Sequence, residues 1–220
     1  MSSVVGAVSL SEAFRRLQGY RLLKPVFAVV VASLVVVSLT YIIISIPNRI
    51  NENVGSPTID GLAYVDTNDR EVIQWLQENV KKSAIIVEAS GRTWVRNNKG
   101  ELEISSHRID YTLAGRVAAR TGLQSPIGWP GHEIQWRPSQ NSREEIERRL
   151  NLVDEIYLAS DSEGVLAILR ELGVNYLVVS GLERASYPDD FLIYFDAILT
   201  LVYSDNIELG ARIYSIPVKE

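Results

Sequence analysis

Residues 26–46 constrain this chain more than any other feature. The run VFAVVVASLVVVSLTYIIISI has 21 residues and no charged side chain. A helix rises ~1.5 Å per residue, so a run of this length crosses the ~30 Å hydrocarbon layer of a bilayer. Valine and isoleucine are weak helix formers in water, but a bilayer favours the helix because it offers the backbone no other partner. The run therefore predicts a transmembrane helix over residues 25–47.

Two alternatives compete with a retained transmembrane helix. A signal peptide normally has an apolar region of ~7–15 residues that ends at a small-residue cleavage site. This run is longer and continues into IPNRI, which is a poor cleavage site. A buried helix of a soluble protein is disfavoured because the run is apolar on all its faces.

Charged residues around the run predict its orientation. Four basic residues and one acidic residue precede it, whereas Arg49 alone follows closely, beside Glu52. The positive-inside rule then places residues 1–24 in the cytoplasm and the rest of the chain outside a cell membrane that it crosses once. The upstream segment SLSEAFRRLQGYRLLK has apolar and basic residues at helical spacing. It is either an amphipathic helix on the inner membrane surface or a simple extension of the anchor.

Composition narrows the classes of function. A chain of 220 residues holds one or two domains, and the absence of cysteine excludes disulfides, thiol catalysis and thiolate metal sites. From Asn48 onward the chain has 18 basic and 26 acidic residues. An acidic domain without a basic stripe argues against nucleic acid as a partner. The membrane lipid bilayer is the first partner that we expect.

The rest of the chain predicts an α/β domain. Residues 48–61 mix Pro, Gly, Asn and Ser without periodicity and predict a linker, which leaves residues 62–220 as an extracytoplasmic domain. Apolar periodicity predicts helices in TNDREVIQWLQENV, IDYTLAGRVAARTGL, SREEIERRLNLVDEIYLAS and SEGVLAILRELG. Short apolar runs predict buried strands in AIIVEAS and VNYLVVSG, and a terminal hairpin in AILTLVYSDNIELGARIYSI. Residues 91–106 predict a loop or a weak hairpin. The alternation of these elements predicts a three-layer, Rossmann-like α/β domain with a C-terminal β-hairpin.

Glu88 is the first candidate for ligand contact. It lies near the carboxyl end of a predicted strand, where ligands gather in open α/β sheets. It either binds a polar ligand or acts as a base, or it is a strand-end carboxylate paired with a nearby arginine such as Arg92. Arg116 and Arg120, one helix turn apart, either clamp a phosphate or belong to a solvated face. His107 is isolated, and we expect it on the surface.

The stretch GWPGHEIQW holds two of the four tryptophans and one of the two histidines. Its two glycines and its proline predict a loop rather than a regular helix or strand. Trp129 and Trp136 offer flat apolar faces for a sugar ring or a lipid boundary. His132 and Glu133 form a titratable pair, and Arg137 adds a fork that binds anions. The alternative is a rigid turn with both indoles packed inward.

Several enzyme classes leave no motif in this sequence. A phosphate-binding glycine loop, an HExxH helix, an Asp-rich calcium loop and a nucleophile elbow are all missing. Adjacent His132 and Glu133 are a weak metal signal, because neighbouring residues rarely bind one ion. We therefore expect no metal ion and no cofactor on this chain. An enzyme that acts on its own is disfavoured, because no complete set of nucleophile, base and orienting group is visible.

Several segments together resemble a known family. EASG, RVAARTGLQSPIGWPGHEIQWR, VDEIYLASD, LGVNYLVVSGLER and ARIYSI resemble the C-terminal region of the large polytopic "YYY" membrane proteins of archaea and Chloroflexi-type bacteria. The resemblance runs from about Asp60 to the end of the chain. The family pattern picks out Glu88, Gly91, Thr121, Gly122, Gly128, Trp129, Pro130, Gly131, His132, Glu133, Trp136 and Arg137.

This resemblance implies a function. The family is similar to C-type glycosyltransferases, which use a lipid-linked sugar donor, face outward from the membrane and carry their catalytic carboxylates on loops between early membrane helices. This chain has one predicted membrane helix. It is therefore expected to be a fragment, or a subunit that works with a polytopic membrane protein, and not to be catalytic alone. A divalent metal would then belong to the full assembly. The alternative is a membrane-anchored, non-enzymatic binding or scaffold domain.

The motifs and the resemblance assign no catalytic residue. The candidates for ligand binding are Glu88, Arg116, Trp129, His132, Glu133, Trp136 and Arg137. The expected ligand is a lipid-linked sugar.

Overall fold

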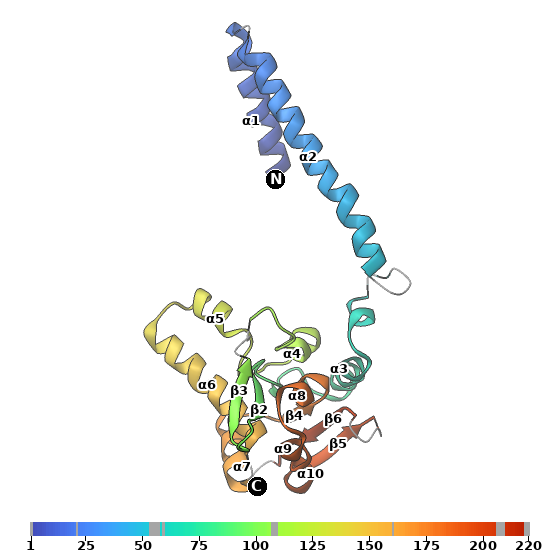
Figure 1. Cartoon of the computed structure of the whole chain (residues 1–220), viewed down its shortest axis with the longest axis vertical. Coiled ribbons are helices and arrows are strands. Elements are labelled where there is room, and N and C mark those ends of the chain that lie inside the picture. The colour runs from blue at the N-terminus through green and yellow to red at the C-terminus, as the bar shows by residue number, and fades with distance from the viewer. Residues whose placement is uncertain are drawn as a thin grey trace. The chain divides into compact units, whose positions relative to one another are not determined.

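The computed structural model describes residues 2–20, 22–52, 58, 60–106, 110–159, 161–205 and 210–217. The chain divides into two compact units, residues 1–60 and residues 61–220 (Figure 1). The first unit contains helix α1 (Ser2–Arg16), the 3-10 turn η1 (Leu17–Gly19) and helix α2 (Leu23–Glu52). The amphipathic segment before the anchor is thus a helix of its own and not an extension of α2.

Helix α2 contains the apolar run. Its residues Leu23–Pro47 are long and apolar enough to cross a membrane, with a mean hydropathy of 2.7 and none of them buried in the protein. A signal sequence near an N-terminus meets the same test of length and composition. An apolar N-terminal helix is therefore confirmed, and its orientation in a cell membrane stays a prediction.

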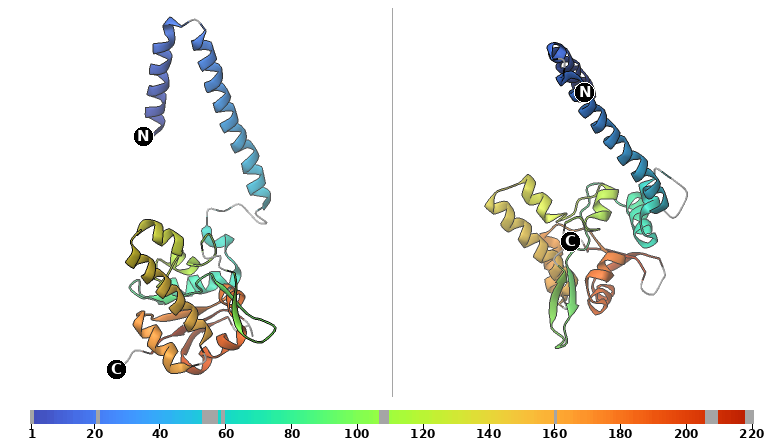
Figure 2. Two further views of the ribbon diagram at one scale, coloured as in Figure 1. Left: turned by 60° about the vertical axis from the view of Figure 1, so that its left-hand side comes forward. Right: turned by 45° about the horizontal axis from the view of Figure 1, so that its top comes forward.

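The first unit differs from expectation at both ends of the anchor. Helix α1 folds back beside α2 (Figure 2). The rings of Phe14 and Phe27 meet edge to face with centroids 5.2 Å apart. Helix α2 continues through Pro47 to Glu52, so the linker predicted from residue 48 begins later. A proline removes one helical hydrogen bond, and the residues after it still have ordinary helix propensities.

The second unit carries the remaining elements. Its helices are η2 (Gly61–Tyr64), α3 (Thr67–Asn79), α4 (Arg116–Thr121), α5 (Pro130–Trp136), α6 (Gln140–Leu158), α7 (Ser162–Glu171), α8 (Gly181–Ser186), α9 (Asp189–Ile193) and α10 (Phe195–Ile198). Its strands are β1 (Ile86–Val87), β2 (Thr93–Arg96), β3 (Leu102–Ser106), β4 (Tyr176–Val179), β5 (Thr200–Ser204) and β6 (Arg212–Ser215).

Among the described residues the strands form a four-stranded mixed sheet, in the order β1-β4-β6-β5, and a separate β2-β3 hairpin. Strands β1 and β4 are parallel, whereas β6 is antiparallel to both β4 and β5. The mixed α/β class, the C-terminal hairpin and the weak hairpin after β1 are therefore confirmed. The Rossmann-like arrangement is not confirmed. Such a fold has a mostly parallel sheet, whereas two of the three pairings described in the larger sheet are antiparallel.

Successive strand residues point to opposite faces of the sheet, and here both faces are buried. Val87, Leu177 and Tyr214 belong to a core cluster with α6, α7, α9 and α10. Their neighbours Ile86, Val178 and Ile213 belong to a second cluster with α3 and α4. Burial on both faces explains why these strands read as continuous apolar runs.

Several helix boundaries differ from those predicted. Helix α3 ends at Asn79, one residue before the end of the predicted segment, and Asp66 caps its start, with its side chain accepting from the Asn68 amide at 3.0 Å. Helix α6 begins at Gln140, two residues before the predicted segment, and Ser139 caps it. The helix expected over residues 109–123 is reduced to α4, because Gly115 at its N-cap has a left-handed φ of 77°.

Tyr157 of α6 lies at the carboxyl ends of the parallel pair. Its hydroxyl is 3.1 Å from the carbonyl oxygen of Val87 on β1 and 2.8 Å from that of Val178 on β4. The side chain is fully buried, and burial raises the pKa of its phenol well above the ordinary value. The phenol therefore stays protonated and can donate to these carbonyl groups.

Candidate functional site

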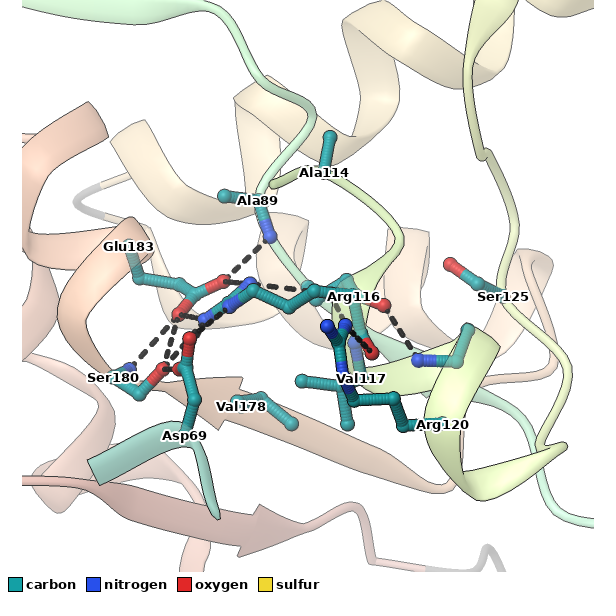
Figure 3. Close-up of polar contacts among 12 residues, drawn as sticks. Asp69, Ala89, Ala114, Arg116, Val117, Arg120, Ser125, Val178, Ser180 and Glu183 are labelled. Atoms are coloured by element: carbon teal, nitrogen blue, oxygen red, sulfur yellow. Dashed lines mark hydrogen bonds and ion pairs between the residues drawn. The ribbon is translucent and has the colours of Figure 1, made fainter. Parts of the chain in front are cut away.

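A buried polar cluster lies where the parallel strands β1 and β4 end. We call Asp69, Glu88, Arg116, Ser180 and Glu183 the buried junction; Figure 3 shows the contacts around Arg116. Asp69 comes from the first turn of α3, Glu88 follows β1, Arg116 begins α4, and the last two belong to the start of α8 after β4. All five are at most 5% exposed. Four separate segments of the chain therefore converge on one guanidinium group.

The Arg116 guanidinium is bonded on every side. It forms a bidentate pair with Asp69, with Nε–Oδ2 and Nη2–Oδ1 distances of 2.6 and 2.9 Å. It also donates to Glu88 Oε2 at 3.1 Å and to Glu183 Oε2 at 2.9 Å. A buried charge is tolerated only when it is paired in this way. These contacts use all three guanidinium nitrogens inside the protein.

The Glu88 carboxylate also bonds the start of helix α4. It accepts from the backbone amides of Val117 and Ala118 at 3.1 and 2.9 Å, which are otherwise unpaired at a helix N-terminus. Burial raises the pKa of Glu88 to about 7, against the opposing effects of Arg116 and of the two amides. Three ionised carboxylates against one guanidinium would leave an excess of buried negative charge, and a protonated Glu88 reduces that excess.

The other two carboxylates of the junction are stabilised in different ways. Arg116 stabilises the charged form of Asp69, and backbone amides bond Glu183. Burial alone would raise the pKa of Asp69, but the bonds and the charge of Arg116 outweigh it, so this pKa lies below its ordinary value. Glu183 accepts from the backbone amides of Ala89 and Ser180 at 2.8 and 2.9 Å. The last contact belongs to the capping box of α8.

A second buried network follows directly after Glu88. Asp154 of α6 accepts from Ser90 Oγ at 2.6 Å, from Tyr187 Oη at 2.7 Å and from Arg92 Nη1 at 3.1 Å. Arg92 also donates to Asn151 and Glu147, at 2.7 Å each. The EASGR segment thus links β1 to α4 through Glu88 and to α6 through Ser90 and Arg92. The pairing of Glu88 with an arginine is observed, and the partner is Arg116 rather than Arg92.

The GWPGHEIQW segment is a short helix, α5, and not the loop that its composition predicts. Pro130 is at the first helical position, where its missing N–H is not needed. Glu133 accepts from the Gly128 amide at 2.8 Å, and Asp110 accepts from the Gly131 amide at 3.0 Å. Two carboxylates therefore bond amides at the start of the helix, which composition alone does not reveal.

Three rings pack together at this end of α5. The ring centroid of Trp129 lies 5.3 Å from that of Tyr111 and 5.1 Å from that of His132, and the last two are 4.9 Å apart. The Trp129 indole N–H donates to the Ala114 carbonyl oxygen at 2.9 Å. The indole of Trp129 is therefore held in one orientation with part of its surface exposed.

An open concavity lies beside this ring cluster. It has a volume of about 500 Å³ and is lined by Ser125, Pro126, Gly128, Trp129, His132, Glu133, Trp136, Arg137 and Arg149. Trp136 is 83% exposed, and Arg137 is also exposed. Among the described residues no carboxylate pairs with Arg137. By contrast, Arg149 is bonded to Glu145 at 2.7 Å. The concavity thus combines aromatic faces with an unpaired guanidinium.

The predicted candidates fall into two separate groups. Trp129, His132, Glu133, Trp136 and Arg137 line the concavity together. Glu88 and Arg116 are buried in the junction, where protein groups fill their bonding positions. Arg120 is exposed while Arg116 is buried, so these two do not form a phosphate clamp.

Sequence reasoning did not single out several residues at these sites: Asp69, Ser180, Tyr111 and Arg149. Glu183 also follows a buried strand and bonds Arg116, whereas its neighbour Arg184 bonds Asp189 at 3.2 Å. Polar residues just after two parallel strands were the available signal for Ser180 and Glu183. No sequence pattern points to Tyr111.

The part of the chain that the structure describes contains no candidate metal site. There, no three His, Asp or Glu side chains are grouped so that they could hold a metal ion. The predicted surface position of His107 lies outside the described residues.

No family model matches the chain. No curated protein matches it either. Among solved structures, it is similar to the C-terminal globular domain of an oligosaccharyltransferase from Archaeoglobus fulgidus, with a TM-score of 0.37 and 10% sequence identity. The alignment covers 70% of this chain and 99% of that domain. A likeness this loose identifies neither a ligand nor a functional residue.

Proposed function

We propose that this chain is the extracytoplasmic domain, with its membrane anchor, of a glycosyltransferase-like assembly that binds a lipid-linked sugar. In this proposal the chain contributes binding and not the transfer chemistry. A polytopic membrane partner would supply the catalytic carboxylates. The resemblance of the Thr121–Arg137 region to "YYY" membrane proteins supports the assignment, and the fold comparison adds no argument to it.

The observation that carries the proposal is the composition of the concavity beside α5. Indole faces bind the C–H faces of sugar rings, and a guanidinium fork binds phosphate through two parallel hydrogen bonds. Trp129 and Trp136 supply the indoles, and Arg137 supplies a fork that no described carboxylate occupies. A sugar attached to a phosphate needs these two kinds of contact side by side.

The buried junction has a different part in this proposal. Glu88 and Arg116 connect β1 to the start of α4, and the chain from α4 leads through Ser125 to the concavity. We assign Glu88 and Arg116 the role of positioning this segment. His132 and Glu133 would orient polar groups of the ligand, although Glu133 is also bonded to the Gly128 amide.

A binding experiment tests the proposal. The full chain in lipid nanodiscs is titrated with a polyprenyl-phosphate sugar, with the polyprenyl phosphate alone and with the free sugar, and tryptophan emission is recorded. We expect the sugar-bearing lipid to bind most tightly. Arg137→Ala should weaken it by about tenfold or more, since a charge-assisted bond contributes ~1.5–3 kcal/mol. Trp136→Ala should also weaken it, because it removes an apolar face for the sugar ring.

Arg170→Ala is the matched control, because Arg170 is exposed on α7 and has no ion pair among the described residues. Equal loss of binding in Arg170→Ala and Arg137→Ala would contradict the proposed site. Absence of binding to any of the three compounds would favour the alternative, a membrane-anchored scaffold domain that binds no sugar.

A further inference from the structure

The region of α4 and α5 has apolar side chains that the fold leaves uncovered. We call Tyr111, Leu113 and Trp136 the aromatic rim. They are 80%, 60% and 83% exposed, whereas the core residues of the same domain are below 10%. The rim is one surface: Tyr111 packs on the rings of Trp129 and His132, and His132 and Trp136 are one turn apart on α5. Leu113 adjoins Ala114, whose carbonyl group bonds the Trp129 indole.

The backbone of Tyr111 indicates that its exposure is maintained at a cost. Its φ of 56° is in the left-handed region, which a bulky residue rarely adopts. Ring contacts with Trp129 and His132 hold the side chain in this conformation. Strained residues of this kind cluster at binding and switch sites. The chain therefore holds an aromatic ring outward where an ordinary turn residue would relieve the strain.

The composition of the rim fits a bilayer surface. Trp and Tyr are enriched at the level of lipid headgroups because each combines an apolar ring with a polar group. Arg137 follows Trp136 directly and forms no ion pair with a described carboxylate, while Glu133 and Glu145 line a pocket with it. A free guanidinium beside exposed rings suits the phosphate groups of anionic lipids.

The chain also keeps the domain within reach of such a surface. Residues 48–60 separate the apolar segment Leu23–Pro47 from the second unit. Residues 48–52 still belong to α2 and rise ~1.5 Å each, and residues 53–60 add at most ~3.6 Å each, so the whole stretch spans at most about 36 Å. A domain of this size has a radius of gyration of about 15 Å, so its diameter is about the same as the tether. The tether thus allows any face to reach the bilayer, and the composition of the faces determines which one does.

We propose that the aromatic rim rests in the headgroup layer of an anionic bilayer, with Tyr111, Leu113 and Trp136 among the headgroups and Arg137 on lipid phosphate. This docking surface shares Trp136 and Arg137 with the proposed sugar site, and it goes beyond the proposed function because it requires α2 to anchor the chain but does not require sugar binding. It gives the domain a fixed orientation toward the membrane.

Single-cysteine labelling tests this proposal on the full chain, because the sequence contains no cysteine. Leu113→Cys and Trp136→Cys are labelled with an environment-sensitive dye and reconstituted into vesicles of phosphatidylcholine with phosphatidylglycerol. Leu201→Cys is the matched control, since Leu201 is an apolar side chain that is 46% exposed on β5. We expect emission at 113 and 136 to shift to shorter wavelength and to be quenched by headgroup-labelled lipid, and neither effect at 201.

Three results would overturn the proposal. Equal emission and quenching at all three positions would mean that the rim does not meet lipid. A shift at 113 that grows with the protein-to-lipid ratio and is insensitive to the lipid quencher would mean contact between copies of the chain. Identical shifts in pure phosphatidylcholine vesicles, or in the Arg137→Gln variant, would contradict the proposed contact between Arg137 and anionic lipid.

A further variant separates this proposal from sugar binding. Leu113 does not line the concavity. Leu113→Asp should therefore reduce quenching of the dye in the labelled Trp136→Cys protein, and in the protein that keeps Trp136 it should leave the affinity for the lipid-linked sugar unchanged. Circular dichroism of the variant checks that the fold is kept. Loss of sugar affinity with unchanged quenching would mean that Leu113 belongs to the sugar site and does not contact the membrane.

Discussion

The buried junction and the α5 concavity are built from similar side chains but differ in how completely the protein satisfies them. In the junction, Arg116 has three carboxylate partners, and every one of them has further bonds to backbone amides or to Ser180. At the concavity, Arg137 has no described carboxylate partner, and Trp136 is 83% exposed. A charged residue at the end of a strand can therefore stabilise the fold without binding a ligand. A charged group that has no partner within the protein indicates a binding surface better than charge by itself.

The largest expected effect is the loss of the guanidinium at the centre of the junction. Arg116→Ala leaves Asp69, Glu88 and Glu183 facing one another without their cation. Breaking a buried ion pair on one side typically costs about 3–5 kcal/mol. We expect the free energy of unfolding to fall by at least that amount in denaturant titrations followed by circular dichroism. An Arg116→Ala protein as stable as the Arg137→Ala control would show that the junction does not stabilise the fold.

The next effect is a dependence of stability on pH that originates in the buried junction. The folded pKa of Glu88 is raised from 4.5 to about 7, so the folded protein binds a proton that the unfolded chain has already lost in this range. Its contribution to stability is complete below pH 4.5 and is lost as the pH rises through 7, a change of about 3 kcal/mol at most.

Thermal unfolding between pH 5 and pH 8 measures this decline. Glu88→Gln should abolish the decline, because the amide does not titrate. Glu155→Gln on the exposed face of α6 should keep it. If the decline persists unchanged in Glu88→Gln, another group is responsible for it.

A smaller effect is expected where the start of α5 is tightly packed. A Cβ atom added at Gly131 would lie 2.1 Å from Asp110 Oδ2, so the carboxylate must move. This movement weakens the hydrogen bond that the Gly131 amide donates to Asp110. Gly131→Ala should therefore cost about 1–3 kcal/mol. Gly128→Ala is the control, because its Cβ atom would meet Glu133 Oε1 at 3.4 Å. Similar melting temperatures for the two variants would indicate that Asp110 moves freely.

The smallest expected effect on stability is at the exposed tryptophan. Trp136→Ala should change the free energy of unfolding by less than about 0.5 kcal/mol, as is usual for exposed positions. Trp129→Ala should cost more, because it removes the bond to the Ala114 carbonyl group and two ring contacts. Both values come from denaturant titration. A large loss in Trp136→Ala would mean that its indole is structural, which would weaken the contrast between the two regions.

Periodic apolar patterns predicted much of the fold. Helices α3, α6 and α7 lie within one or two residues of their expected positions, and both buried strands are present in shorter form. The segment from Ser180 to Ile198 was not predicted to be helical, because α8, α9 and α10 are too short to develop a periodicity. Helix α5 was missed because Pro130 and Gly131 read as loop residues, although a proline at the first helical position favours a helix.

The candidate site was less accessible to sequence reasoning. The order of residues in GWPGHEIQW pointed to side chains that do line one concavity. Glu88 and Arg116 were singled out by their positions, but Asp69 and Glu183 are 47 and 67 residues from Arg116 in sequence. A pairing over such distances depends on the order of the strands, which single-sequence periodicity does not give.

The phenol of Tyr157 bridges the two parallel strands at the end of the sheet where the junction lies. The described pairing of β1 and β4 extends over two registered residues, and beyond it Glu88 and Glu183 both bond Arg116. One hydroxyl lies within bonding distance of a carbonyl oxygen on each strand and so adds a cross-link to this short pairing. Helix α6, which lines the concavity through Arg149, therefore also contacts the end of the sheet where the junction lies.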